Sequence, residues 1–285
     1  MEQIILALRN DRVQVAVGKP GATAVVRGLY EEYLRTDDRI SGWEEAVRRL
    51  WEREHLPRGR VQLILPGGTA IVQSLKLPPM RRNQLSQAVQ NEMQYNVDHK
   101  LITDYIPAGR EKSGAWHVLT CSCLLEEMRY FPDMMKRLKL KLKCVTASAE
   151  PLLRLLRATL ETQNRSLIFL CFDETYLLWV LIEDGVCRRV SCTPLRKEPG
   201  SVHFAEEAAQ SVLNSIRLRN ARRIEKLRPP VYLAGCTDNV FQRCGASFHV
   251  SGFPVRAMPA CERIRGIPKE KPIHNWLSCV GALLK

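Results

Sequence analysis

The alternation of apolar and polar residues between positions 61 and 105 predicts two strands followed by a helix. The run Val61–Leu65 is short and rich in branched apolar side chains, and Pro66-Gly67-Gly68 ends it, as expected of a buried strand. A second extended segment over 70–77 ends at Pro78-Pro79, where proline disfavours helix in the residue before it. Helical spacing of apolar positions follows, at Leu85, Ala88, Val89, Met93 and Val97.

The N-terminal region predicts two short strands and a helix. Residues 4–8 and 13–17 form apolar runs joined by the polar turn 9–12, which has hairpin length. Residues 37–54 have helical periodicity, with Ser41 as the expected N-cap and Glu44 as its capping-box partner. The apolar side of this helix consists of Trp43, Val47, Leu50 and Trp51.

The second half of the chain repeats the pattern of the first. Strands are predicted at 166–172 and 176–182, joined by a polar turn and ending in Asp184-Gly185, so two related lobes are expected. The remaining predicted elements are strands at 116–124, 139–145, 186–192 and 230–235, and helices at 126–138, 150–160, 205–216 and 277–284.

The composition is that of a globular protein with about two domains. The chain has 285 residues, 45% of them hydrophobic, and a formal charge of +13. This charge favours acidic partners, anionic lipid headgroups or nucleic acid. The basic run 136–143 could form a membrane patch, but lysines on an exposed strand face need no ligand. The cluster Arg217, Arg219, Arg222 and Arg223 lacks interleaved aromatic residues, so nucleic acid is disfavoured and solvated helix surface is expected.

Several classes of site and location are disfavoured by the sequence. No apolar run approaches the ~20 residues that cross a bilayer, and the N-terminus is a poor signal peptide, so a cytoplasmic protein is expected. The ten cysteines include no Cys-x-x-Cys pair and behave as small core residues. No metal site is expected, because neither cysteines nor histidines show ligand spacing. No catalytic motif of a hydrolase or Walker-type ATPase is present.

The order of elements resembles the PilM family, the actin-like cytoplasmic proteins of type IV pilus machines. The matching positions are the strand Val61–Leu65, the strand 71–78 ending in Leu-Pro, Glu92 and the pair Asp104-Tyr105. The resemblance implies an α/β, actin-like (ASKHA, FtsA/PilM-type) two-lobed fold with a small inserted α/β subdomain. It places the first lobe at 1–70, the inserted subdomain at 71–147, a return to the first lobe at 148–164 and the second lobe at 165–285.

The same resemblance implies that the nucleotide site is degenerate. In the family, two phosphate loops each supply an Asp and a Gly, which here correspond to Ala7 with Arg9 and to Cys171 with Asp173. The paired glycines beside the adenosine correspond to Gly235 and Cys236. Carboxylates hold magnesium and glycines let backbone amides approach phosphates, so these substitutions predict a pseudo-ATPase without a cofactor. ATP with magnesium would bind only if neighbours such as Asp11, Asp173 or Glu174 compensate.

The expected function is a non-catalytic scaffold of a type IV pilus or related machine, peripheral on the inner face of the cell membrane. The resemblance implies binding of the cytoplasmic tail of a PilN-like membrane protein in a groove between the first lobe and the insertion, and contacts with other platform or motor proteins. Strand addition beside Val118, Leu119 and Thr120 is the expected mode. Two alternatives are an active ATPase of the same fold and a basic nucleic-acid-binding protein. GspL-like secretion proteins share the architecture but normally continue into a membrane-spanning segment.

Overall fold

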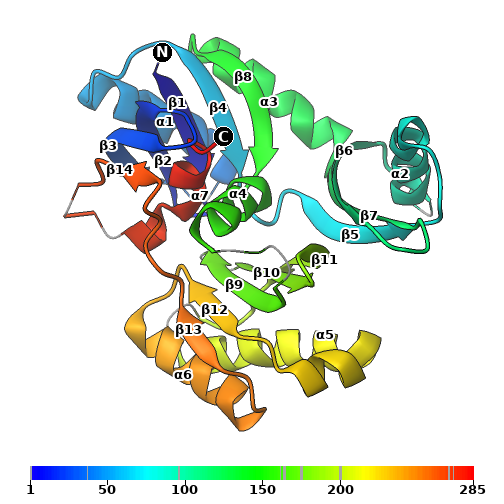
Figure 1. Cartoon of the computed structure of the whole chain (residues 1–285). Helices are drawn as coiled ribbons and strands as arrows, with labels where there is room; N and C mark the ends of the chain where they lie inside the picture. The colour runs from blue at the N-terminus through cyan, green and yellow to red at the C-terminus, as the bar shows by residue number, and fades with distance from the viewer. Residues whose placement is uncertain are drawn as a thin grey trace.

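Two β-sheets, with helices on both faces, build the molecule (Figure 1). The computed structural model describes residues 2–36, 38–95, 97–160, 162, 165–173, 176–198, 201–268, 270–271 and 273–285.

The first lobe is built on a six-stranded sheet. Strands β1 (Gln3–Leu8), β2 (Arg12–Lys19) and β3 (Ala24–Tyr33) form an antiparallel meander. Strand β4 (Arg60–Leu65) pairs in parallel with β1, and β8 (Lys141–Ala147) pairs in parallel with β4. The short β14 (Ile264–Arg265) completes the order β14-β3-β2-β1-β4-β8. All six residues of β1 are buried, because helices cover both faces of the sheet at this position.

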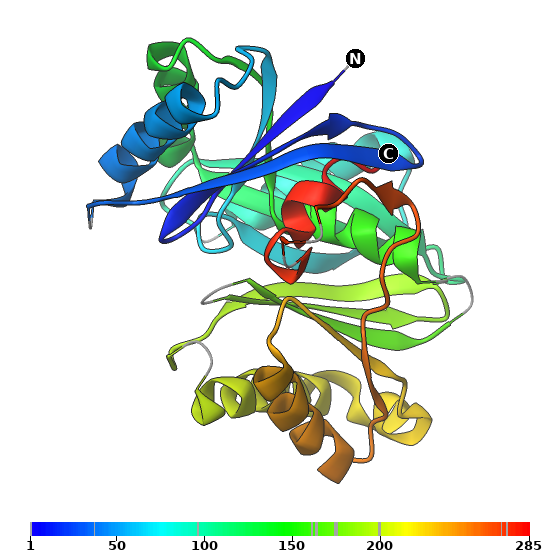
Figure 2. The ribbon, with the colours of Figure 1, turned by 90° about the vertical axis from the view of Figure 1, so that its left-hand side faces the viewer.

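Helices α1 (Arg39–Arg53) and α3 (Leu125–Arg137) lie side by side on one face of this sheet (Figure 2). The predicted apolar side of α1 is confirmed, since Trp43, Val47, Leu50 and Trp51 all belong to the core. The predicted N-cap is wrong: the Asp38 carboxylate, not Ser41, accepts from the backbone N–H groups of Ile40 and Ser41. Aspartate and serine cap helices about equally well, so local sequence does not distinguish them.

The second lobe repeats the topology of the first. Strands β9 (Leu167–Asp173), β10 (Tyr176–Glu183) and β11 (Val186–Pro194) form a meander, and β12 (Val231–Ala234) pairs in parallel with β9. Strand β13 (Val255–Ala257) follows β12 in parallel. The order β11-β10-β9-β12-β13 therefore matches β3-β2-β1-β4-β8. The predicted pair of related lobes is confirmed.

Helices α5 (Val202–Leu227) and α6 (Asp238–Val250) cover the outer face of the second sheet. Its inner face packs against α4 (Ala149–Thr159), which also contacts α7 (Leu277–Gly281) of the first lobe. Helix α5 extends beyond the predicted 205–216 and includes the arginine cluster. Arg217 is exposed there, and the side chains of Arg219, Arg222 and Arg223 lie outside the described part of the chain.

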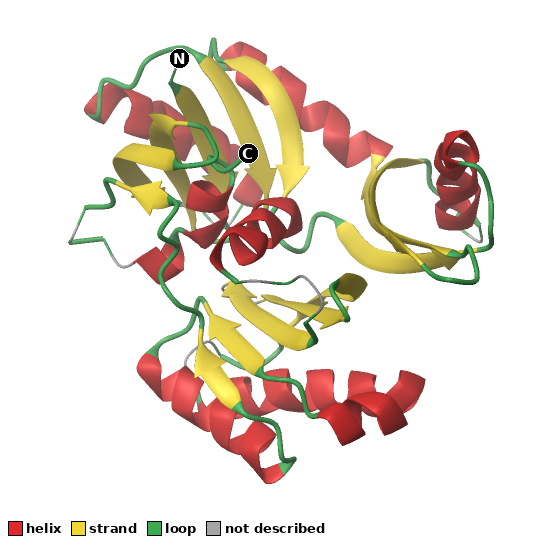
Figure 3. Cartoon of the chain, viewed as in Figure 1, coloured by secondary structure: helices red, strands yellow, loops and turns green. Residues whose placement is uncertain are grey.

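The insertion projects to one side of both lobes (Figure 3). It contains β5 (Ile71–Leu77), the 3₁₀ turn η1 (Arg82–Gln84), α2 (Leu85–Gln94), β6 (Leu101–Arg110) and β7 (Trp116–Leu124). Helix α2 packs on one face of this small sheet. Strand β5 meets β11 at the single pair Gln73 and Ser191, which extends the second sheet to β13-β12-β9-β10-β11-β5-β7-β6.

Two segments lie outside the lobes that the sequence indicates for them. Strand β8 and helix α3 were expected in the insertion at 71–147, but β8 pairs with β4 and α3 packs in the core of the first lobe. Strand β14 and helix α7 fall within the predicted second lobe at 165–285, but they pack against β3 and β1 of the first lobe. Chain order cannot reveal these returns, because pairing between distant segments is decided by tertiary packing.

All ten cysteines are free thiols, and six of them are buried within the hydrophobic clusters. In the described part of the chain, no helix is long and apolar enough to span a bilayer.

Candidate functional site: the cleft between the lobes

A cavity of about 160 Å³ lies between the two lobes. Its walls come from the β1–β2 turn, α4, the end of β9, the start of α5, the β12–α6 junction, and the segment from 274 to 278 that includes η2 (Ile273–Asn275). The lining residues are Arg9, Arg12, Leu152, Cys171, Phe172, Phe204, Gly235, Cys236, Thr237, Val240, His274, Asn275, Leu277 and Ser278.

The sequence indicates six positions in the degenerate phosphate loops and adenosine segment. Four of them line this one cavity, namely Arg9, Cys171, Gly235 and Cys236. They come from three separate segments, and the duplicated topology brings them together where the two lobes face each other. Ala7 is instead fully buried in the core of the first lobe, among apolar residues that include α7. Asp173 ends β9, and its side chain lies outside the described part of the chain, as does the whole of Glu174.

The side chain of Arg9 occupies the first-lobe side of the cleft. It is 5% exposed, and its Nε donates to Gln14 Oε1 at 3.0 Å while Nη2 donates to Ser278 Oγ at 2.7 Å. The guanidinium therefore connects the first hairpin with the C-terminal helix α7, whose residue Ser278 is 269 positions away in sequence. A charged group that donates in two directions from a buried position is held in one orientation.

The backbone of the same turn is also committed to internal hydrogen bonds. Arg9 N–H donates to the carbonyl of Arg12 at 2.9 Å, and the Arg9 carbonyl accepts from Trp43 Nε1 at 2.7 Å. Phosphate loops work through backbone N–H groups that point at the ligand. In this turn the N–H of Arg9 already has a partner within the hairpin.

Gly235 is required by packing between strands. Its φ is +71°, and a Cβ at this position would lie 2.3 Å from the Phe172 carbonyl oxygen of the neighbouring strand β9. Only glycine fits there, whether or not a ligand binds. The next residue, Cys236, carries its side chain into the cavity wall where a second glycine would leave space.

The thiols of the cleft are not activated. Cys171 is 2% exposed, and its Sγ donates weakly to the Phe172 carbonyl. Burial, followed by the nearby charge of Asp238, raises the pKa of Cys236 to about 11, so this thiol is neutral at pH 7. Neither group supplies the carboxylate that coordinates magnesium in phosphoryl transfer.

Among the described lining residues, none is an aspartate or a glutamate. Asp11, offered by the sequence as a displaced carboxylate, is not in the cavity lining and forms an ion pair with its neighbour Arg12 at 2.9 Å. Within the described residues, no group of three or more His, Cys, Asp or Glu side chains could hold a metal ion. Sites for drug-sized ligands typically have about 300 to 1,000 Å³, roughly two to six times the volume of this cavity.

Strand addition beside Val118–Thr120 is wrong. These residues lie in β7, which pairs with β5 on one side and with β6 on the other, and all three are buried. An interior strand has no free backbone groups to offer a peptide. The alternating pattern of 116–124 predicts a strand correctly, but nothing local to it indicates whether the strand is central or at the edge.

The edge of the insertion is β6, the last strand of the eight-stranded sheet. Its residues alternate between partly buried and exposed, and the exposed ones include Ile102 at 44%, Asp104 and Ile106 at 40%. An edge strand with exposed branched residues combines unpaired backbone groups with an apolar row. The sequence carries this signal only as two isoleucines four residues apart.

Structural comparison identifies similar architectures in solved structures. The PilM-PilN type IV pilus biogenesis complex matches with a TM-score of 0.72 and 14% identity, over 99% of this chain and 98% of that chain. The chain has an actin-like fold. A protein of actin-like ATPase fold from Bacteroides thetaiotaomicron VPI-5482 matches with a TM-score of 0.57 and 10% identity, over 99% and 95% of the two chains.

A third similar structure is the cytoplasmic domain of EpsL, an inner membrane component of the type II secretion system of Vibrio cholerae. It matches with a TM-score of 0.55 and 12% identity, over 99% of this chain and 95% of that one. No protein-family model matches the sequence, and no curated protein matches it either. At these identities the structural similarity establishes the actin-like fold, which the sequence predicted, and leaves function to the site.

Proposed function

We propose that this protein is a non-catalytic scaffold of a type IV pilus or related secretion machine, in which the nucleotide cleft of the actin-like fold is closed by the protein's own side chains. The observation that carries the proposal is the buried guanidinium of Arg9, which lines the first-lobe side of the cleft and donates to Ser278 of α7. The arginine fills space that a glycine would leave to phosphates. The absence of carboxylates from the described cleft lining supports the same conclusion.

Two similar solved structures support the proposal that the protein belongs to a pilus or secretion machine. One similar structure is a PilM-PilN complex of type IV pilus biogenesis, and another belongs to an inner membrane component of type II secretion. Both cover nearly the whole of this chain, including the insertion. We infer that the chain works at the inner face of the cell membrane, beside a PilN-like membrane protein and further platform or motor proteins.

The proposed docking site for the tail of the PilN-like protein is the outer edge of β6. An extended tail would pair with the outer backbone groups of this edge strand, taking the place of the Asp104 carboxylate at the Tyr105 N–H, and would cover Ile102 and Ile106. Main-chain hydrogen bonds then supply affinity, and the apolar row selects the register of the tail.

Calorimetry with ATP and magnesium tests the closed cleft. The wild-type chain is expected to show no binding at micromolar nucleotide. The variant Arg9→Gly should keep the fold, as judged by circular dichroism, and gain no hydrolysis, because Cys171 still cannot coordinate the metal. Micromolar binding or turnover by the wild-type chain would contradict the proposal.

A binding assay with the cytoplasmic tail peptide of the PilN-like protein from the same organism tests the docking site. The variants Ile102→Asp and Ile106→Asp should each weaken binding by about tenfold or more, because a charge replaces a buried apolar contact. Val250→Asp is the matched control, since Val250 is 91% exposed on α6 in the other lobe. Equal effects of all three substitutions would exclude the edge of β6 as the docking site.

A further inference from the structure

A second and larger hollow lies on the first lobe, far from the cleft and from the insertion. It has a volume of about 700 Å³ and opens between the C-terminal ends of α1 and α3. Figure 1 shows the starts of β4 and β8, next to these helix ends, at the end of the first lobe opposite the second lobe. We call this hollow the basic groove; it is lined by Val47, Arg48, Trp51, Glu52, His55, Leu56, Arg58, Arg137, Leu138, Lys139 and Leu140.

The floor of the basic groove is apolar. Trp51, Leu56 and Leu140 lie at its base, each less than a tenth exposed, and they belong to the core between α1 and α3. Trp51 Nε1 donates to the carbonyl of Pro57 at 3.3 Å, which fixes the indole ring and the loop after α1 together. A rigid apolar floor below an open rim is the usual construction of a pocket for a large side chain.

The rim is positively charged. Arg58 and Lys139 are exposed, whereas Arg48 and Arg137 share Glu44 through contacts of 3.3 and 2.8 Å. Glu52 is the acidic residue among the lining side chains. Glu44 and Glu52 therefore balance two of the four lysine and arginine charges, and the groove keeps a net positive charge.

Further basic residues lie on the face of the first sheet that is opposite to the groove. Arg60 of β4 stands directly opposite Lys141 of β8 in the parallel register, so two like charges are neighbours on adjoining strands. Such a pair destabilises the sheet slightly unless a negative ligand lies nearby. Lys143 Nζ donates to Gln3 Oε1 at 3.2 Å on that same face of the sheet. Lys136 is exposed on α3, and Asp133 is an exposed acid on the same helix.

Two basic residues of the rim sit where glycine is the ordinary choice. His55 and Lys139 follow the ends of α1 and α3 with φ of +49° and +56°, in the left-handed conformation that side chains disfavour. Glycine at either position would remove this conformational cost. Because these positions carry histidine and lysine, both side chains lie at the mouth of the groove.

We propose that the basic groove binds an acidic segment of a partner protein, with a large apolar side chain of that segment packed against Trp51, Leu56 and Leu140. Carboxylates of the segment pair with Arg58 and Lys139. Because the apolar floor is recessed below charged residues, it can accept a side chain of a partner protein. A membrane-binding surface would instead present apolar side chains that protrude into the bilayer. Among the described residues, the large apolar side chains with high exposure lie elsewhere on the molecule. The recessed indole of Trp51 also offers no face for stacking a base.

Fluorescence anisotropy of the full chain tests this proposal, with a fluorescein-labelled peptide of about twelve residues that is rich in glutamate and carries one central phenylalanine. The double variant Arg58→Glu with Lys139→Glu should weaken binding by about tenfold or more. The matched control is Arg217→Glu with Arg243→Glu, which changes the net charge equally at exposed positions of α5 and α6. Circular dichroism of both double variants checks that the fold is retained.

A second peptide, with glycine in place of the phenylalanine, tests the apolar floor and should bind about fivefold to tenfold more weakly than the first. Equal losses in the groove variant and its control would overturn the proposal, since binding would then depend on net charge alone. The proposal would also be overturned if the double variant Arg58→Glu with Lys139→Glu lost binding to vesicles containing phosphatidylglycerol, or to random duplex DNA, but bound the peptide as tightly as the wild type. None of these readouts involves the cleft or the edge of β6, so this proposal and the proposed function can fail separately.

Discussion

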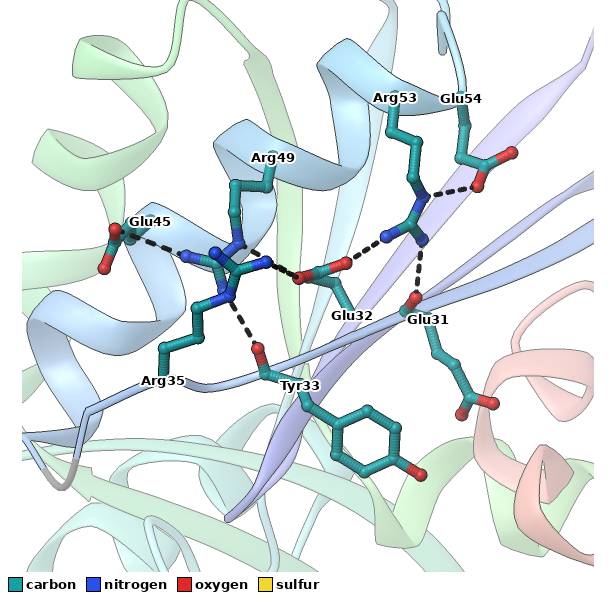
Figure 4. Close-up of polar contacts among 8 residues, drawn as sticks. All are labelled: Glu31, Glu32, Tyr33, Arg35, Glu45, Arg49, Arg53 and Glu54. Carbon is teal, nitrogen blue, oxygen red and sulfur yellow. Dashed lines mark hydrogen bonds and ion pairs between the residues drawn. The ribbon is translucent and has the colours of Figure 1, made fainter.

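Two glutamate-centred ion clusters hold different parts of the molecule together. In the first, Glu32 of β3 faces α1, and Figure 4 shows its carboxylate between Arg49 and Arg53 of that helix. Arg49 Nε donates to Glu32 Oε1 at 3.0 Å, Arg53 donates to Glu32 Oε2, and Arg35 lies 3.9 Å away. The Glu32 side chain is 9% exposed, and every member of this cluster lies within one lobe.

The second cluster is centred on Glu111, between β6 and β7 of the insertion. Glu111 accepts from Lys76 Nζ at 3.0 Å and Arg188 Nη1 at 3.2 Å, and His117 Nε2 lies 2.7 Å from its Oε1. Arg188 belongs to β11 of the second lobe and also lies 3.5 Å from Glu183. This cluster therefore bridges two units that the strand pair Gln73 with Ser191 also joins.

The two clusters have different roles, one in the stability of a lobe and the other in the position of the insertion. The Glu32 carboxylate and Arg49 are largely removed from solvent and hold a helix on the sheet of their own lobe, so removing the charge of Glu32 leaves Arg49 without a charged acceptor in a poorly solvated place. The Glu111 side chain is 24% exposed, and water and salt screen its ion pairs. We therefore expect the first cluster to support the fold and the second to set where the insertion, with its β6 edge, lies relative to the second lobe.

Removing the charge of Glu32 should have the largest effect on stability. Glu32→Gln is expected to lower the free energy of unfolding by about 1 to 3 kcal/mol, because Arg49 and Arg53 lose a charged acceptor. Urea denaturation measures the change. The control Glu45→Gln removes a more exposed partner of Arg49, 3.3 Å away, and should change the free energy of unfolding by less than about 0.5 kcal/mol. Similar losses in both variants would contradict the role given to Glu32.

Acid should erase the difference between the wild-type protein and Glu32→Gln. Burial raises the pKa of Glu32, but hydrogen bonds from Arg49 and Arg53 outweigh it and hold the pKa below the ordinary value of 4.5. A carboxyl group whose pKa is lower in the folded state contributes stability above its unfolded pKa and loses it as pH falls through the folded value. Urea denaturation from pH 7 to pH 3 should show the two proteins converging. A gap that widens on acidification would refute this linkage.

Breaking the Glu111 cluster should loosen the junction between β5 of the insertion and β11 of the second lobe without unfolding the protein. In Arg188→Ala, the urea midpoint is expected to stay near that of the wild type, because Arg188 is partly exposed. Amide hydrogen exchange near Gln73 and Ser191 should become several times faster, since this pair is the hydrogen-bonded link between β5 and β11. Glu206→Gln, which removes an exposed ion pair with His203 on α5, is the control and should leave this exchange unchanged.

The smallest expected effect is that of mild acid on the same junction. The hydrogen bond from His117, followed by that from Lys76, lowers the pKa of Glu111 to about 2, so this carboxylate stays charged well below its ordinary value. The stability that it contributes is fully present above its unfolded pKa and is lost progressively as the pH falls from there toward 2. Exchange at the junction, corrected for the intrinsic pH dependence, should therefore hold steady from about pH 7 to about pH 5 and become faster only at lower pH. Loosening within the range from pH 7 to pH 5 would show that Glu111 is not held in this way.

The sequence by itself determined the local elements and the residues that face inward. Apolar spacing identified the buried side of α1, the strands of both meanders except β3, and the repeat that links the lobes. The resemblance to the PilM family assigned Arg9, Cys171, Gly235 and Cys236 to one nucleotide site, and all four line the cleft. These features depend on periodicity and order along the chain, which a single sequence contains.

Tertiary structure alone decided which strands are central, where the chain returns, and how the cleft is filled. Nothing in 116–124 distinguishes an interior strand from an edge, and β7 became interior because β5 and β6 pair on its two sides. Nothing near Arg9 indicates that its partner is Ser278, 269 residues away. Local propensity acts over a few residues, whereas strand order and buried polar contacts are set by which remote surfaces bury one another, so they become visible only in the folded molecule.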